Sequence, residues 1–209
     1  MPSERRPTHD QCAMKPRTLT YIKAAVFIAC LLPLARAAYI VISGMQVNPI
    51  EFITRSTGTW TLVMLLLSLS ITPLRKLTGL NELIKFRRML GLFAFFYVAL
   101  HFTTYIWLDQ AFDVAAVLKD IVKRPFITVG FAAFILLIPL AITSTDAMLR
   151  RLKRNWGKLH KLVYLIAPLS VLHYIWLVKK DLTQPLIYAG VLTVLLGLRI
   201  WWRWQPRKG

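Results

Sequence analysis

The sequence predicts an all-α integral membrane protein, a bundle of six transmembrane helices. Three observations lead to this prediction: 56% of the 209 residues are hydrophobic, the mean hydropathy is +0.54, and the apolar residues form six continuous runs. Each run is close to the ~20 residues that an α-helix needs to cross ~30 Å of hydrocarbon. A transmembrane β-barrel would instead show alternating segments of roughly ten residues.

Six spans are expected, and turn-forming or charged residues separate them. They cover residues 24–42, 58–74, 89–108, 125–143, 159–178 and 185–202. Pro125 and Pro185 stand in the first turn of a span, where a helix tolerates proline. We detect no internal repeat and no low-complexity segment. The expected organisation is one membrane domain over 21–204, between an N-terminal tail at 1–20 and a C-terminal tail at 205–209.

The first span has a second interpretation. Basic residues precede an apolar run that ends in the small-x-small sequence Ala35-Arg36-Ala37, as in a secretory signal peptide. The apolar character resumes over 38–42, so the whole run is long enough to span. We expect an uncleaved helix, and cleavage would leave the orientation of the later spans unchanged. The true start is open between Met1 and Met14.

The charge of the chain excludes several classes of protein. Lys and Arg number 27 against 9 for Asp and Glu, for a formal net charge of +18. A nucleic-acid-binding protein keeps such charge on a solvated face. A chain as hydrophobic as this one has little solvated face, which argues against nucleic-acid binding. The apolar content excludes disorder, and two cysteines exclude a disulfide scaffold.

The basic residues instead indicate an orientation, because most of them flank the side of the spans that holds both termini. On the opposite side the Lys and Arg residues are Arg55, Lys119, Lys123, Arg124, Lys179 and Lys180. The positive-inside rule then makes the richer side cytoplasmic. We therefore expect both termini in the cytoplasm.

Histidines are the main ionisable residues within the spans, where such residues are rare and usually functional. His101 lies 13 residues beyond Arg88, and His173 lies 12 residues beyond Lys161. At ~1.5 Å per residue, both imidazoles lie about 18–20 Å from the cytoplasmic side. The third and fifth spans run in the same direction, so the two histidines are predicted to lie at matching depth. Bis-histidine ligation of a haem iron requires this arrangement.

His101 and His173 have three possible roles other than haem ligation, namely packing, zinc binding and proton transfer. A single buried histidine can be a packing residue that is hydrogen-bonded to a backbone carbonyl, and this alternative stays open. Zinc would need further Cys, Asp or Glu ligands, and the sequence places none at that depth. A proton relay usually includes an intramembrane carboxylate, and the acidic residues fall in loops or at helix ends.

His160 is expected at the inner membrane edge, where it is a candidate ligand of a second haem. It precedes His173 by 13 residues, about 19.5 Å along a helix. A strict α-helix would turn the two side chains more than ~100° apart, although Pro168 between them could allow a kink or register shift. An interfacial histidine with no ligand role is the alternative.

The second ligand of an inner haem is open. The matching position on the third span holds Arg87, followed by Arg88, and neither is a usual iron ligand. A pentacoordinate haem, a water molecule or Met89 are the alternatives. Basic residues at this edge could pair with haem propionates or could only set topology. They are Arg87, Arg88, Arg151 and Arg154.

Several sequence blocks resemble the ferric-reductase-like transmembrane family, whose members include NADPH oxidases and ferric reductases. The blocks are FRRMLGL at 86–92, LHFTTY at 100–105, TSTDAM at 143–148, WGKLHKLVY at 156–164, HYIW at 173–176 and QPLIYAG at 184–190. Within that family, the chain is most similar to the haem-binding membrane subunits of bacterial protein-methionine-sulfoxide reductase systems. The resemblance covers nearly the whole chain from about residue 18.

The resemblance implies one or two b-type haems, with His101, His160 and His173 as iron ligands. It also implies a bacterial inner-membrane location and an electron donor on the cytoplasmic side, either a flavin reductase or the quinone pool. The acceptor would be a separate periplasmic molybdopterin enzyme that reduces methionine sulfoxide in oxidised proteins. Some family members carry flavin mononucleotide (FMN).

The chain departs from the NADPH oxidases in two ways. It lacks the first histidine of the third span, and it shows no FAD or NADPH domain and no Gly-rich dinucleotide motif. We therefore expect electrons to be donated by another protein or by a quinone. A small membrane transporter, or a structural anchor without haem, remains the alternative function.

Overall fold

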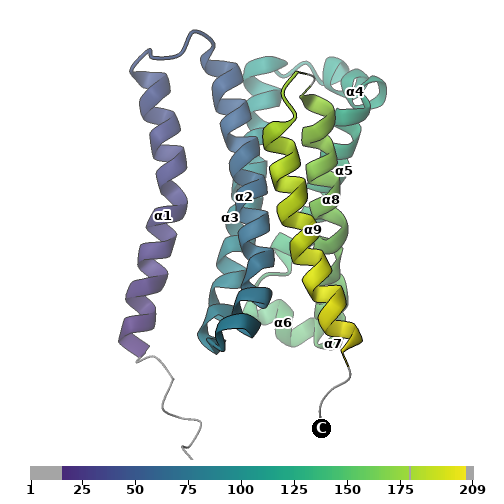
Figure 1. The fold of residues 1–209 in the computed structure, drawn as a ribbon. Helices are drawn as coiled ribbons and strands as arrows, with labels where there is room; N and C mark the ends of the chain where they lie inside the picture. The colour runs from purple at the N-terminus through teal and green to yellow at the C-terminus, as the bar shows by residue number, and fades with distance from the viewer. Residues whose placement is uncertain (1–15, 179, 206–209) are drawn as a thin grey trace, which may run out of the picture.

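The computed structural model, which describes residues 16–178 and 180–205, is a bundle of long helices with no strand in that part of the chain (Figure 1). Its α-helices are α1 Pro16–Ile42, α2 Pro49–Thr78, α3 Ile84–Thr104, α4 Val114–Lys123, α5 Pro125–Ile142, α6 Asp146–Leu152, α7 Arg154–Leu159, α8 Val163–Leu177 and α9 Thr183–Trp204. Short 3-10 turns at Asn81–Leu83 and His160–Leu162 and a π-helical turn at Tyr105–Asp109 join or extend them.

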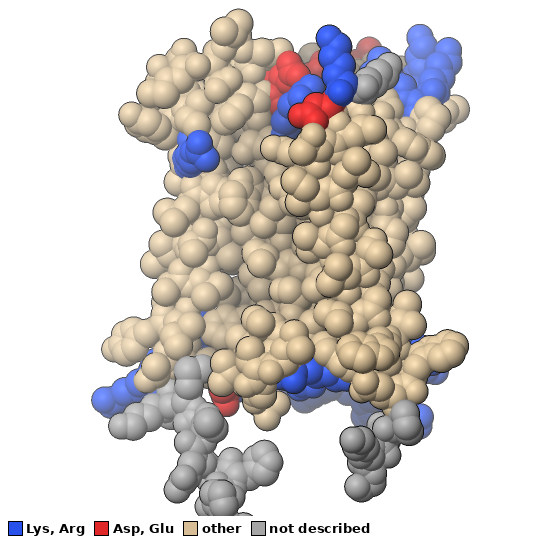
Figure 2. All heavy atoms as spheres, in the orientation of Figure 1, with Lys and Arg blue, Asp and Glu red and all other residues tan. Residues whose placement is uncertain are grey.

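Six helical segments of the described chain are long and apolar enough to cross a membrane, which confirms the predicted fold class. They are Arg17–Ile42, Pro49–Thr78, Asn81–Asp109, Pro125–Ile142, Arg154–Leu177 and Thr183–Trp204. Figure 2 shows a nearly uncharged band of side chains between two ends that carry the Lys, Arg, Asp and Glu residues. This distribution fits a multi-pass membrane protein, because charged groups are costly inside hydrocarbon.

The second span is longer than predicted. α2 begins at Pro49 rather than near residue 58, and the Asn48 side chain caps it by accepting the Glu51 N–H at 3.2 Å. The predicted span starts late, near residue 58, because Glu51 and Arg55 make the first turns of α2 too polar for hydropathy to detect. These two residues form an ion pair at 2.7 Å along the helix. The cap and the pair stabilise two polar turns that the apolar pattern does not reveal.

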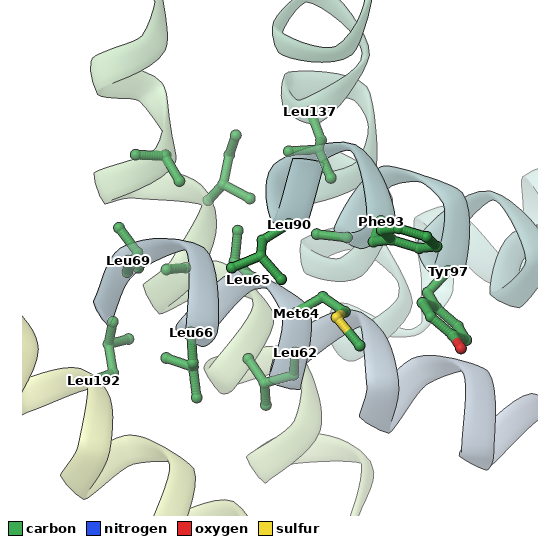
Figure 3. Close-up of a cluster of buried hydrophobic side chains, with 14 of the residues drawn as sticks. Leu62, Met64, Leu65, Leu66, Leu69, Leu90, Phe93, Tyr97, Leu137 and Leu192 are labelled. Atoms are coloured by element: carbon green, nitrogen blue, oxygen red, sulfur yellow. The ribbon is translucent and has the colours of Figure 1, made fainter. Parts of the chain in front are cut away.

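α2 is the central helix of the bundle and supplies much of the buried core (Figure 3). Leu65 and Leu69 are among the most deeply buried large side chains of the described residues. Around α2 pack residues of three other helices, namely Leu90, Phe93 and Tyr97 of α3, Leu137 of α5 and Leu192 of α9. This packing holds α3 and α5 in fixed positions beside α2.

α1 lies at the side of the bundle, where it contacts α2 and α3 (Figure 1). The Tyr97 hydroxyl of α3 donates a hydrogen bond of 2.7 Å to the Cys30 carbonyl of α1. The rings of Phe27 and Phe93 pack edge to face at 5.1 Å between centroids. α1 is continuous from Pro16, so residues 16–20 of the predicted N-terminal tail are helical. The rest of that tail lies outside the described residues.

Three short helices occur where the sequence suggested loops. α4 forms within the acidic segment after the third span, and the Asp113 side chain caps it by accepting the Ala116 N–H at 3.0 Å. α6 lies between the fourth and fifth spans, and α7 forms the first turns of the fifth span. The fifth span changes helix type at His160–Leu162, whereas α8 continues through Pro168. The local change in winding that we considered at Pro168 therefore lies at His160 instead.

Candidate functional site

A cavity of about 660 Å³ lies between α2, α3, α5 and α8, toward the end of the bundle that carries α4. His101 of α3 and His173 of α8 both line it. Most of the remaining wall is apolar, including Leu62 and Phe134. The volume falls within the ~300–1,000 Å³ that is typical of cavities for small molecules and cofactors.

The structure brings His101 and His173 together across this cavity. Their ring centroids are 6.2 Å apart, and the ring planes are inclined by 76°. Two metal–imidazole bonds of about 2.0–2.1 Å, with the ring radii added, put ligand centroids roughly 6–6.5 Å apart. The observed separation therefore fits two imidazoles that bind one metal ion from opposite sides.

Both histidines are held by the same kind of hydrogen bond. His101 Nδ1 lies 2.9 Å from the Thr54 carbonyl oxygen, and His173 Nδ1 lies 2.6 Å from the Phe126 carbonyl oxygen. A carbonyl oxygen can only accept, so Nδ1 of each ring carries the hydrogen. Nε2 is then left with its lone pair. Histidines that ligate a metal commonly have this arrangement, which fixes the tautomer and the ring orientation.

The pair offers a metal ion two ligands from the protein. No group of three or more His, Cys, Asp or Glu residues within the described part of the chain could hold a metal ion. Two axial imidazoles suit an iron whose other ligands come from a macrocycle. The donor atoms, their spacing and the apolar walls all fit a haem.

His160 lies apart from this pair, in a second cavity of about 230 Å³ nearer the other end of the bundle. Its ring stacks on Trp156 at 3.8 Å between centroids, and its Nδ1 lies 3.1 Å from the Trp156 carbonyl oxygen. Its Nε2 lies 3.5 Å from the Ser144 hydroxyl. Leu65 and Leu137 line both cavities and separate them.

The His160 cavity does not fit a haem as the structure describes it. Its volume is below the ~300–1,000 Å³ range, and no second histidine lines it. Met89, considered as a partner ligand, packs against the hydrophobic core and does not line this cavity. Arg87 and Arg88 do line it, and Arg88 forms an ion pair of 2.5 Å with Asp146.

The comparisons with known proteins agree with this architecture. Residues 56–171 match the family described as the ferric reductase like transmembrane component. A relative from Herminiimonas arsenicoxydans is 57% identical over 197 residues, which cover 92% of this chain and 90% of the relative. A relative from Ralstonia nicotianae is 53% identical over 199 residues, with 93% and 92% covered. Each is named protein-methionine-sulfoxide reductase heme-binding subunit MsrQ.

The chain belongs to the MsrQ family. A further MsrQ relative, from Bordetella pertussis, is 52% identical over 192 residues, covering 90% of this chain and 93% of the relative. The family match runs from residue 56 within α2 to residue 171 within α8, so it includes His101 and ends two residues before His173. The predicted resemblance is thus confirmed, while the three histidine ligands remain a prediction.

Two basic residues of the His101–His173 cavity were not among the predicted site residues. Arg55 and Arg124 line the His101–His173 cavity, at the end of the bundle where α2 and α5 begin. In the sequence, these two arginines were noted only among the basic residues on the side of the spans opposite to the termini. One signal in the sequence could have identified them. Each stands near the start of a span that is next in the chain to a span with a histidine. Arg151 and Arg154, for which propionate pairing and a role in topology were both considered, line neither cavity.

Proposed function

We propose that this chain is the haem-carrying membrane subunit of a protein-methionine-sulfoxide reductase system, with His101 and His173 as axial ligands of one b-type haem. The facing imidazole pair carries the proposal, because its centroid separation of 6.2 Å and its two Nδ1–carbonyl contacts suit bis-histidine ligation. The names of the MsrQ relatives, which describe heme-binding subunits, support it.

Each part of the cavity has a role in this proposal. The carbonyls of Thr54 and Phe126 hold the imidazoles with Nε2 free for iron. The apolar walls exclude water, and Arg55 and Arg124 supply positive charge for carboxylate groups at the rim. The haem itself supplies one-electron chemistry, while the protein orients it and tunes its potential.

We further propose the direction of electron flow. The histidine pair lies toward the end of the bundle opposite to the start of α1 and the end of α9 (Figure 1). With both termini cytoplasmic, the haem lies near the periplasmic face of a bacterial inner membrane. Electrons from a cytoplasmic flavin reductase or a quinone would then pass to a separate periplasmic molybdopterin subunit, where methionine sulfoxide is reduced. FMN is a further candidate cofactor.

His160 keeps a separate place in the proposal as the candidate ligand of an inner haem. Its Nδ1 contacts a carbonyl oxygen, as in the other two histidines, and arginines line its cavity. The cavity would have to open before it could hold such a group. We therefore assign no step in electron transfer to His160.

A dithionite-reduced minus oxidised absorbance spectrum of the purified protein tests the proposed function. We expect b-type bands from the unaltered chain and their loss at the bis-histidine site in both His101→Ala and His173→Ala. His160→Ala, in the separate cavity, is the matched control and should keep them. A wild-type protein without b-type bands would contradict the proposal, and would leave a transporter or a structural anchor as the function.

A further inference from the structure

His101 and His173 each lie directly against a glycine of the neighbouring helix. A Cβ atom at position 58 would lie 3.0 Å from His101 Cε1 and 3.1 Å from its Nδ1. A Cβ atom at position 130 would lie 2.6 Å from His173 Nδ1 and 2.8 Å from its Cε1. Any residue larger than glycine would therefore press on each imidazole ring, and more strongly at position 130 than at position 58.

Each glycine follows, by one helical turn, the carbonyl that its histidine contacts. Gly58 stands four residues after Thr54 on α2, and Gly130 stands four residues after Phe126 on α5. In an α-helix, residues four apart lie on one face. The carbonyl and the absent side chain thus form a single notch on each helix, and the imidazole occupies it.

The two notches are copies of one arrangement. Gly58 and Gly130 are 72 positions apart, as are their carbonyl residues and the two histidines. The same offset relates further residues that line the cavity, including Thr61 and Ala133, Leu62 and Phe134, and Val98 and Ser170. No repeat is detectable in the sequence because most of these pairs differ in residue type. The structure corrects that expectation, since α2–α3 and α5–α8 present equivalent faces to the cavity.

We propose that Gly58 and Gly130 are positioning residues that set the orientation of the imidazoles of His101 and His173 toward the iron. The inference rests on the proposed function. Without a Cβ, the helix backbone approaches the ring closely enough for Nδ1 to reach the carbonyl, and Nε2 consequently faces the cavity. A methyl group at either position would turn the ring away from its carbonyl and change the angle between the two imidazole planes.

The test compares glycine-to-alanine variants that differ in this contact alone. Gly130→Ala and Gly58→Ala are the test variants. Gly91→Ala, on the same helix as His101, would meet only the Ser68 hydroxyl at 3.7 Å, and Gly190→Ala on α9 would meet nothing within 4 Å. Alanine has the higher helix propensity, so the two uncrowded control variants are expected to be at least as stable as the wild type.

The readouts are the EPR spectrum of the ferric haem and its midpoint potential, because both respond to axial-ligand orientation. We expect Gly130→Ala to shift the low-spin signal or lose most of it, and Gly58→Ala to change it less. The two control variants should match the wild type in both measurements. Helix content from circular dichroism should stay unchanged in all of them.

The outcomes separate this inference from the proposed function. Wild-type protein with bis-histidine signals, together with unchanged EPR spectra and potentials in both test variants, would overturn the role of the glycines and leave the haem proposal intact. Wild-type protein without a low-spin haem would overturn both. If Gly130→Ala does not fold, the less crowded Gly58→Ala decides the matter.

Discussion

His101 and His173 reach one cavity because each stands a similar number of residues after the basic residues at the start of its span. This count is available from the sequence and predicts their depth. It does not predict which way each ring turns, because that depends on the Thr54 and Phe126 carbonyls of other helices. The proposed roles of Gly58 and Gly130 could not be predicted from the sequence either, because each glycine contacts a histidine of another helix.

Arg124 should raise the midpoint potential of a haem in the His101–His173 cavity, because its positive charge lines the cavity and favours the reduced state. We expect Arg124→Gln to lower the potential by roughly 40 mV, which corresponds to about 1 kcal/mol for one electron. The Asp120 carboxylate, now 3.1 Å from Arg124 Nε, would lose this partner and add to the effect. Potentiometric titration measures it, with Lys119→Gln as a control outside the cavity. An unchanged or higher potential would contradict this role.

His160 is separated from the His101–His173 pair by Leu65 and Leu137, so its removal should leave that pair intact. We expect His160→Ala to keep the low-spin spectrum assigned to His101 and His173. Absorbance and EPR spectra of the variant check this. A pyridine haemochrome assay on the same samples counts haem per chain. A lower count in the variant than in the wild type would indicate that the His160 cavity opens to hold a second haem. Loss of the low-spin spectrum assigned to His101 and His173 would refute the separation of the two sites.

At the scale of the helices, the sequence predicts long apolar elements well and short polar ones poorly. The six spans follow from hydropathy because the hydrocarbon requires about 20 apolar residues for each. α4 was missed because it has only ten residues, and Lys119, Asp120 and Lys123 among them made the segment look like a charged loop. The polar start of α2 was missed because its stability comes from a cap and an ion pair rather than from apolar residues.

α1 has few neighbours, and the hydrogen bond from Tyr97 to the Cys30 carbonyl is one of its attachments to α3. We expect Tyr97→Phe to destabilise the protein by about 0.5–1 kcal/mol, the usual contribution of one such bond in a membrane protein. Thermal unfolding in detergent, followed by tryptophan fluorescence, measures the change. Tyr39→Phe is the control, since Tyr39 is 64% exposed on the same helix. Equal melting temperatures for Tyr97→Phe and the wild type would argue against this attachment.

At the scale of the whole molecule, charge sorting predicts an orientation, and this orientation stays a prediction. α1 begins and α9 ends at the same end of the bundle (Figure 1). The histidine cavity lies toward the other end. The sequence could not reveal that the His101–His173 cavity and the His160 cavity are separate, because Leu65 and Leu137 look like ordinary core residues.

The orientation can be measured with single cysteines in a chain that carries Cys12→Ser and Cys30→Ala. Lys119→Cys on α4 should react with a membrane-impermeant maleimide in intact spheroplasts. Arg150→Cys on α6 should react only after the membrane is permeabilised, because the positive-inside rule places it in the cytoplasm. Both residues are exposed at their ends of the bundle. The reverse labelling pattern would invert the proposed direction of electron flow.

The repeated notch has a consequence for how the protein matures in the cell. The first half of the site, α2 with α3, leaves the ribosome complete with its own histidine, carbonyl and glycine. The second half is complete only when α8 has been synthesised and inserted. A haem held by both halves must therefore be acquired late. Its binding would join two successively inserted hairpins into one unit and favour the assembled bundle over its separated parts.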